Sequence, residues 1–242
     1  SITTTGLRFY MVGETFTGEG PGSADLIKHY VNPGMLDGQF DFPLYWQVVK
    51  TFLREEQDFR GIESMLQWNE GYYGSWAVMS NFLGNHDVCR ALSHAAGDIA
   101  DMWGNGSKEQ GWLNPPGLPG VSEPFKRLRL AWTFLMTVRG IPLIYYGDEY
   151  GLPGAGDPDN RRFMQAEGDL GANQIETLNH VQKLTTARKA HPCLSRGTRT
   201  THSVGQNTWV YTMGGCGDTA EVTVAINRAD DTQSVDIPAG TY

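Results

Sequence analysis

The chain has 242 residues, with 19 lysines and arginines against 27 aspartates and glutamates, which gives a formal net charge of −8 at pH 7. This mildly acidic balance argues against nucleic acid or an anionic membrane as the main partner. No apolar run approaches the roughly 20 residues that a bilayer-spanning helix requires.

The first third of the chain alternates between strand-like and helical segments. Apolar residues at every second position indicate strands, and apolar residues three or four positions apart indicate helices. On these grounds we expect strands over residues 1–13 and Gln39–Leu44, and helices over Ala24–Tyr30, Tyr45–Arg54 and Phe59–Asn69.

The alternation continues through the middle of the chain. Residues 103–120 are rich in glycine, proline and asparagine, and we expect a long loop there, which is usually functional or mobile. Ser122 is the expected N-cap of the helix that follows the loop. The elements expected in this part are a strand over Ala77–Leu83, a helix over Phe125–Val138, a strand over 141–146 and a helix over Asn173–Ala190.

Four strand–helix units in succession predict a parallel sheet with right-handed crossovers. A closed barrel of this kind has eight units, and four alone leave two open sheet edges. We therefore expect the chain to be a segment of a longer protein that supplies four further strands. After Pro192 the pattern changes, which divides the chain into residues 1–191 and 192–242. In the second part we expect short strands over Thr208–Thr212, Ala220–Ile226 and Ser234–Ile237.

Three of the expected strands end in the same pattern, an apolar run followed by glycine and then by a carboxylate. Gly13 precedes Glu14, Gly147 precedes Asp148, and Gly84 stands just before His86 and Asp87. Because the carboxyl ends of parallel strands lie at one rim of a barrel, we expect these polar groups to gather there.

These segments resemble the α-amylase family of glycoside hydrolases, glycoside hydrolase family 13, over roughly residues 1–195. The family consists of (β/α)8 barrels, so the resemblance implies the C-terminal half of a TIM barrel, strands five to eight, followed by the truncated start of a β-sandwich domain. The four segments that carry the resemblance are Met11–Glu19, Phe82–Asp87, Gly140–Glu149 and Asp157–Arg161.

The resemblance assigns Glu14 as the general acid/base. A carboxylic acid at a strand mouth, walled by Phe16 and other aromatic side chains, would be desolvated, and desolvation raises its pKa. The resemblance gives Asp87 the role of binding sugar hydroxyls and stabilising positive charge at the anomeric carbon. From the residues alone, Asp87 could equally be a nucleophile. The family's own nucleophile, an aspartate after the fourth strand, would precede Ser1.

Further site residues also follow from the resemblance. His86 would bind sugar hydroxyls, and Asp157 and Arg161 match the substrate-contacting loop, although Arg161 could instead hold that loop by pairing with Asp159. Asp41, the other early carboxylate at a strand, is expected to be structural. We expect a group at the last strand end to support the cleft rather than to catalyse: Tyr146, Asp148 and Glu149.

The function implied is a retaining glycoside hydrolase that acts on α-1,4 linkages of starch or maltodextrins, with transglycosylation open on the same site. The chain would carry the acid/base but not the nucleophile, so we expect it to be inactive alone and to need the N-terminal half of the barrel as a partner. The alternative is a non-catalytic scaffold of the same fold that binds carbohydrate or another protein.

No cysteine or histidine cluster has metal-binding spacing, so we expect no cofactor in this chain. The resemblance implies a structural calcium ion in many members, with its ligands mostly in the other half of the barrel. Cys193 and Cys216 could pair or remain free thiols. A secreted or periplasmic location is favoured over a cytoplasmic one.

Overall fold

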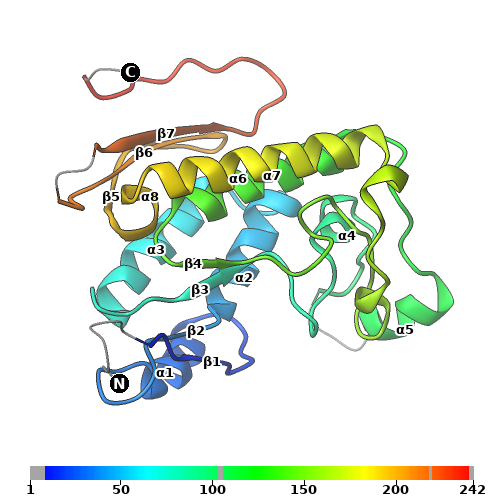
Figure 1. Ribbon diagram of the computed structural model, residues 1–242, viewed down its shortest axis with the longest axis horizontal. Helices are drawn as coiled ribbons and strands as arrows, with labels where there is room; N and C mark the ends of the chain where they lie inside the picture. The colour runs from blue at the N-terminus through cyan, green and yellow to red at the C-terminus, as the bar shows by residue number, and fades with distance from the viewer. Residues whose placement is uncertain (1–8, 103–105, 218–219, 240–242) are drawn as a thin grey trace.

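The computed structural model describes residues 9–102, 106–217 and 220–239 (Figure 1). Among them, short parallel strands form the centre of the first part, and their bounds are β1 Val12–Gly13, β2 Gly38–Gln39, β3 Ser80–Phe82 and β4 Ile141–Leu143. β1 pairs with β2 and β3 pairs with β4, all in parallel, and a bridge between Phe40 and Ser80 joins the two pairs. The strands therefore follow one another in chain order, as in one half of a parallel barrel.

Helices connect these strands and pack against one another around them (Figure 1). Their bounds are α1 Pro21–Tyr30, α2 Phe42–Val48 with a π-helical extension over Val49–Leu53, α3 Phe59–Tyr73, α4 Ala91–Ala95, α5 Gly106–Leu113, α6 Glu123–Thr137, α7 Ala172–Ala190 and α8 Cys193–Arg196. The half barrel expected from the sequence is confirmed. Within the described residues, no helix combines the length and the apolar character needed to cross a membrane.

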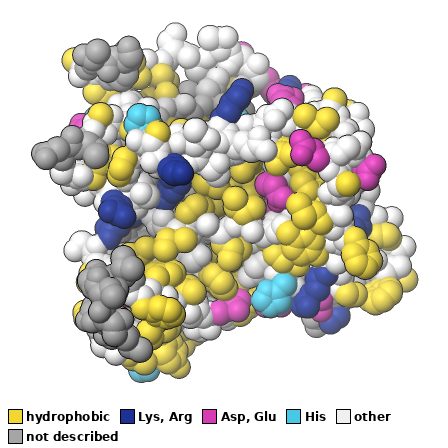
Figure 2. Space-filling view, in the orientation of Figure 1, with side chains coloured by type: hydrophobic (Ala, Val, Ile, Leu, Met, Phe, Trp, Pro, Cys, Tyr) yellow, Lys and Arg dark blue, Asp and Glu magenta, His cyan; other side chains and the backbone are white. Residues whose placement is uncertain are grey.

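The strands keep apolar side chains open to solvent. Figure 2 shows hydrophobic side chains gathered over the middle of the face that Figure 1 presents. On and beside β1 and β4, the exposed apolar residues are Met11, Val12, Ile141 and Ile144. A strand side chain in a finished barrel would be covered, so this face is a surface that a further layer of protein could bury.

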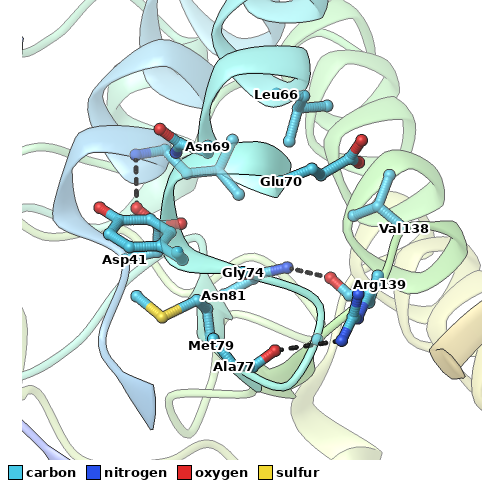
Figure 3. Close-up of a pocket in the computed structure, with 13 residues that line it drawn as sticks. Asp41, Leu66, Asn69, Glu70, Gly74, Ala77, Met79, Asn81, Val138 and Arg139 are labelled. Carbon is cyan, nitrogen blue, oxygen red and sulfur yellow. Dashed lines mark hydrogen bonds between the residues drawn. The ribbon is translucent and has the colours of Figure 1, made fainter. Parts of the chain in front are cut away.

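The second strand is shorter than expected, because a helix begins inside the predicted range. The Asp41 side chain accepts a hydrogen bond of 3.1 Å from the backbone N–H of Leu44 and caps α2 (Figure 3). Pro43 sits in the first turn of that helix, where its fixed φ and missing N–H are well tolerated. The prediction of a strand over Gln39–Leu44 is therefore wrong beyond Phe40, and Asp41 is structural, as expected.

Two other expectations need correction, and a third is tested only in part. Residues 106–113 of the predicted loop form α5, and residues 103–105 lie outside the described part. The strand predicted over Ser234–Ile237 is absent from the described residues, which have no regular structure there. For the first predicted strand, residues 1–8 lie outside the described part, and of the described residues 9–13 only Val12–Gly13 form a strand, β1.

An antiparallel sheet forms the second part of the chain, in the order β5 Thr198–Val204, β6 Thr208–Gly214 and β7 Val222–Asn227. The predictions for β6 and β7 are confirmed, whereas β5 was not predicted. Its sequence, Thr-Arg-Thr-Thr-His-Ser-Val, is almost entirely polar and gives no apolar alternation. The sheet is the partial β domain that the sequence indicated.

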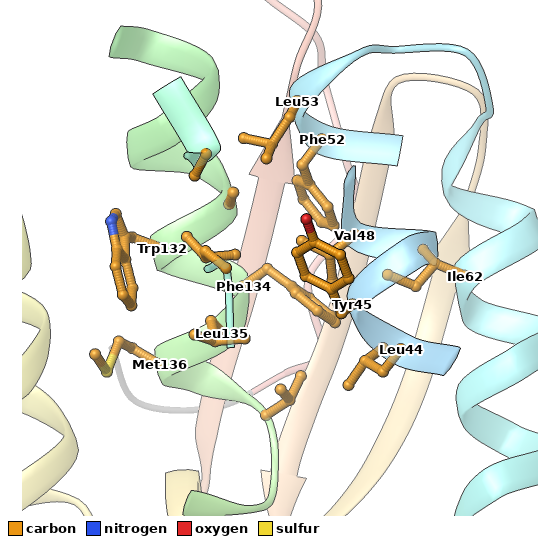
Figure 4. Close-up of a cluster of buried hydrophobic side chains, with 14 of the residues drawn as sticks. Leu44, Tyr45, Val48, Phe52, Leu53, Ile62, Trp132, Phe134, Leu135 and Met136 are labelled. Atoms are coloured by element: carbon orange, nitrogen blue, oxygen red, sulfur yellow. The ribbon is translucent and has the colours of Figure 1, made fainter. Parts of the chain in front are cut away.

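One hydrophobic core runs through both parts of the chain. Phe52 of the π-helical extension stacks on Phe134 of α6, with ring centroids 4.9 Å apart (Figure 4). Trp209 of β6 is fully buried and lies 5.7 Å from Phe134 and 5.9 Å from Phe59. The core is continuous across Pro192, so the predicted boundary there does not separate two hydrophobic cores. The division of the chain into two domains at this point stays a prediction.

Polar contacts also join the sheet to the helices. Arg199 of β5 is buried and forms ion pairs with Glu63 and Glu70 of α3. Cys193 and Cys216 form a disulfide with their Cα atoms 5.4 Å apart, which settles the pairing that the sequence left open. Buried pairs and a covalent link of this kind fix the sheet against the half barrel.

Candidate active site

The loops that follow β1, β3 and β4 carry the polar groups expected at the rim. Glu14 follows β1, and His86 and Asp87 follow β3. Gly84, between β3 and His86, must lack a side chain, because a Cβ atom there would lie 2.3 Å from Oδ2 of Asp148. The absence of that side chain lets the loops after β3 and β4 approach each other closely.

Asp87 lies at the centre of a charged cluster. Its Oδ2 is 3.4 Å from Nε2 of His86, and its Oδ1 is 3.8 Å from Nη2 of Arg161. Arg161 donates through Nε to Oδ1 of Asp157 at 2.7 Å, and Lys108 lies 3.8 Å from the other oxygen of Asp157. The side chains of His86 and Asp87 are 51% and 38% exposed, so the cluster is open to a ligand. The structure thus brings four of the five predicted site residues into one network.

Glu14, the fifth predicted site residue, lies on the surface, and the charges of Asp87 and His86 shift its pKa. Partial burial raises the pKa of Glu14, the negative charge of Asp87 raises it further, and His86 lowers it. The direction is the one expected for a general acid. Phe16, which we expected to wall Glu14, packs on Phe42 with ring centroids 4.6 Å apart and on Trp46 at 6.4 Å.

A buried arginine, which we did not predict from the sequence, joins the loops that form the rim. Arg90 is fully buried and donates to the backbone oxygens of Tyr146 at 2.6 Å and Asn160 at 2.7 Å, and to Oδ1 of Asp148 at 3.1 Å. Its guanidinium lies over the rings of Tyr145 and Tyr146, 4.2 and 4.7 Å from their centroids. Burial raises the pKa of Asp148 to about 6, and Arg90 opposes that rise. Asp148 is thus buried and paired with Arg90, and its role as a support of the cleft stays a prediction.

The loop that carries Asp157 and Arg161 is held by other residues. Asn160 donates through Nδ2 to the backbone oxygens of His86 at 2.9 Å and Val88 at 2.8 Å, so it ties this loop to the one after β3. Asp159 accepts two hydrogen bonds from Arg162, at 2.8 and 2.7 Å. Since Arg162 satisfies Asp159, the alternative that Arg161 holds the loop through Asp159 is wrong, and Arg161 is directed to the cluster.

Other supports come from the last strand and its loop. The hydroxyl of Tyr146 donates to the backbone oxygen of Arg162 at 3.0 Å. Across the described residues, no three histidine, cysteine or acidic side chains are grouped in a way that could hold a metal ion. Glu14 and the charged cluster therefore combine carboxylates with the imidazole of His86, the guanidinium of Arg161 and the ammonium of Lys108, which can donate protons and bind hydroxyl groups.

A family model described as "Alpha amylase, catalytic domain" matches residues 3–170. Among curated relatives, the cyclomaltodextrin glucanotransferase of Bacillus licheniformis is 26% identical over 237 residues, which cover 96% of this chain and 28% of that protein. In eight curated relatives, the matched region makes up between 16% and 39% of the relative's own length.

Solved structures show the same similarity. The α-amylase of Anoxybacillus superposes with a TM-score of 0.72 at 26% identity, over 93% of this chain and 42% of that one. The α-amylase of Geobacillus thermoleovorans, whose structure is complexed with acarbose, gives a TM-score of 0.68 at 26% identity, over 89% of this chain and 41% of that one.

Proposed function

The chain belongs to the α-amylase family of glycoside hydrolases, and from that premise we propose that the protein acts on α-glucans such as starch and maltodextrins. The reaction is hydrolysis of α-1,4 linkages with retention of configuration. The names of the relatives, amylases and cyclomaltodextrin glucanotransferases, support this substrate class. Transfer to a second sugar is a variant of the same chemistry, and the names of the glucanotransferase relatives support it as the second candidate reaction.

The observation that carries the proposal is the electrostatic link between Glu14 and the charged cluster. A general acid must hold its proton until the leaving oxygen needs it, and the raised pKa of Glu14 serves that purpose. Asp87 and His86 are near enough for their charges to act on Glu14, and their side chains can hydrogen-bond to sugar hydroxyls. Arg161, paired with both Asp87 and Asp157, fixes these acceptors in place.

A retaining mechanism also needs a nucleophilic carboxylate about 5 Å from the acid. We place this nucleophile outside the 242 residues, at the end of the barrel's fourth strand, because the relatives extend well beyond the matched region. Asp87 is the candidate within the chain, but its pairing with Arg161 suits a residue that binds substrate.

The N-terminal half of the barrel is the proposed partner. It would cover the apolar face of Figure 2 and pair with the open edges of β1 and β4. The disulfide between Cys193 and Cys216 supports a secreted or periplasmic location, since disulfides persist in oxidising compartments.

The experiment that tests the assignment is replacement of Glu14 in the protein that contains both barrel halves. Glu14→Gln keeps the size of the side chain but removes the proton donor, so hydrolysis of soluble starch should slow by about 10²- to 10⁴-fold. Glu123→Gln, at an exposed carboxylate on α6, is the matched control and should leave the rate unchanged. A near-native rate in Glu14→Gln would show that Glu14 is not the general acid/base.

A further inference from the structure

A surface pocket lies outside the charged cluster, where α1, α2 and α3 meet. Its volume is about 250 Å³. Its apolar lining comes from Pro21 and Ala24 of α1, Pro43 of α2 and Met65 of α3. We propose that this hollow, the α1–α3 pocket, binds one glucosyl unit of an α-glucan, so that the protein holds its polymer at a place distinct from the rim. The inference rests on the proposed function only in its choice of glucan as the sugar.

An aromatic side chain forms one side of the α1–α3 pocket. Trp68 of α3 is 42% exposed and stacks on Tyr72, with ring centroids 4.5 Å apart and planes 15° apart. The hydroxyl of Tyr72 donates to Oδ1 of Asp25 on α1, so the stacked pair is held against the neighbouring helix. A fixed indole with an accessible side offers a flat apolar surface, which suits the C–H face of a pyranose ring.

A buried amide that lines the α1–α3 pocket lacks hydrogen-bond partners among the described residues. Asn69 is only 4% exposed, and among the described residues neither its Nδ2 nor its Oδ1 is paired. A buried polar group left unpaired costs about 1–3 kcal/mol. A sugar hydroxyl both donates and accepts, so it can satisfy an amide. Asn69 also borders a smaller cavity of about 60 Å³ (Figure 3), where water is the competing partner.

The charge of the α1–α3 pocket indicates a neutral ligand. Its one ionised side chain, Glu19, accepts 2.5 Å and 3.0 Å hydrogen bonds from Lys50 and Gln47. Because Lys50 balances Glu19, neither a cation nor an anion gains from entering. The volume is slightly below the roughly 300–1,000 Å³ typical of pockets for drug-sized ligands. The pocket therefore fits one small, neutral, hydroxyl-rich ring.

The test is isothermal titration calorimetry of maltotriose with the 242-residue chain, with far-UV circular dichroism of each variant as a folding check. Trp68→Ala should weaken binding at least tenfold, and Trp68→Phe should recover part of the loss because it keeps an aromatic face. Trp112→Ala, at a 71% exposed tryptophan on α5, is the matched control and should bind as the unaltered chain does.

Three results would overturn the inference: no maltotriose binding by the unaltered chain, binding in an Arg161→Ala background that Trp68→Ala leaves unchanged, or equal losses in the Trp68 and Trp112 variants. To separate this pocket from the rim, Trp68→Ala is repeated in an Arg161→Ala background, where the same loss should remain. The assay measures no hydrolysis. A Trp68-dependent binding signal would therefore stand even if the complete protein proved unable to cleave starch.

Discussion

At the residue scale, the acidity of Glu14 depends on its neighbours at the rim. Partial burial and the charge of Asp87 both raise the pKa of Glu14. A higher pKa keeps the carboxyl protonated to a higher pH, which extends the range in which it can act as a general acid. The basic limb of a pH–rate profile should therefore report Glu14.

Asp87→Asn removes one of the two influences that raise the pKa of Glu14, and the pKa of Glu14 should fall. The measurement is a carbon-13 NMR titration of the Glu14 carboxyl in the chain, which needs no catalytic activity. His86→Ala is the opposing variant, because the positive charge of a protonated His86 lowers the pKa of Glu14. A pKa of Glu14 that is equal in all three proteins would contradict the link between Glu14 and the cluster.

Asp41 gives a prediction about stability. Burial raises the pKa of Asp41 from 3.8 to about 7, so the folded chain holds this proton more tightly than the unfolded chain. The contribution of Asp41 to the free energy of unfolding is then largest below about pH 4, falls as the pH rises to about 7, and is constant above that. Each pKa unit corresponds to about 1.4 kcal/mol.

Asp41→Asn keeps an oxygen that can cap α2 but does not ionise. This variant should lose the decline in stability between pH 4 and pH 7, and at pH 7 it should be at least as stable as the unaltered chain. Urea denaturation across this pH range measures both quantities. A decline that persists unchanged in Asp41→Asn would show that other groups cause it.

At the element scale, Arg90 joins the loops after β3 and β4 to the loop that carries Arg161. Its replacement leaves Asp148 buried without its charged partner. Breaking a buried ion pair by removing one partner costs about 3–5 kcal/mol. Arg90→Met should therefore lower the free energy of unfolding by about that amount.

The matched control for Arg90→Met is Arg60→Met, which removes an exposed pair with Asp58 and should change stability little. Chemical denaturation of both variants measures the difference. Equal effects from the two substitutions would show that Arg90 does not support the rim in the way that its contacts indicate.

The elements that the sequence predicted well are those with a regular apolar pattern. α3 and α6 place apolar residues at helical spacing and bury them against the shared core. The second strand was misassigned because Phe40–Asp41–Phe42 alternates like a strand, while the N-cap and Pro43 start a helix. β5 was missed because its polar residues are ordered by pairing with β6, a contact between segments that its own sequence does not reveal.

In the site, too, residues with a local sequence signal were predicted and residues placed by long-range contacts were not. Glu14, His86 and Asp87 stand directly after strands, so their common rim follows from parallel topology. Arg90 and Asn160 act through long-range contacts with backbone oxygens, which no local pattern encodes. The one local sign of Arg90 in the sequence is a basic residue inside an otherwise apolar run, Val88–Leu92.

At the scale of the whole molecule, the half barrel and the small sheet share one core. Trp209 of β6 packs between Phe59 and Phe134, and Thr137 of α6 is hydrogen-bonded to Tyr211 of β6 at 2.6 Å. The sheet therefore supports the helices around β1–β4. No described element covers the exposed apolar side chains on and beside β1 and β4 in the same way.

We propose that this chain carries the acid/base half of a glucan-cleaving site and depends on an N-terminal half for its nucleophile. The most direct test measures reducing-sugar release from soluble starch by the purified 242-residue chain, alone and mixed with the N-terminal half of a family barrel. We expect no release by the chain alone and release after mixing, and Glu14→Gln should abolish that release. Release by the chain alone would place the nucleophile within it, with Asp87 the first candidate, and would show that the N-terminal half is not needed for cleavage.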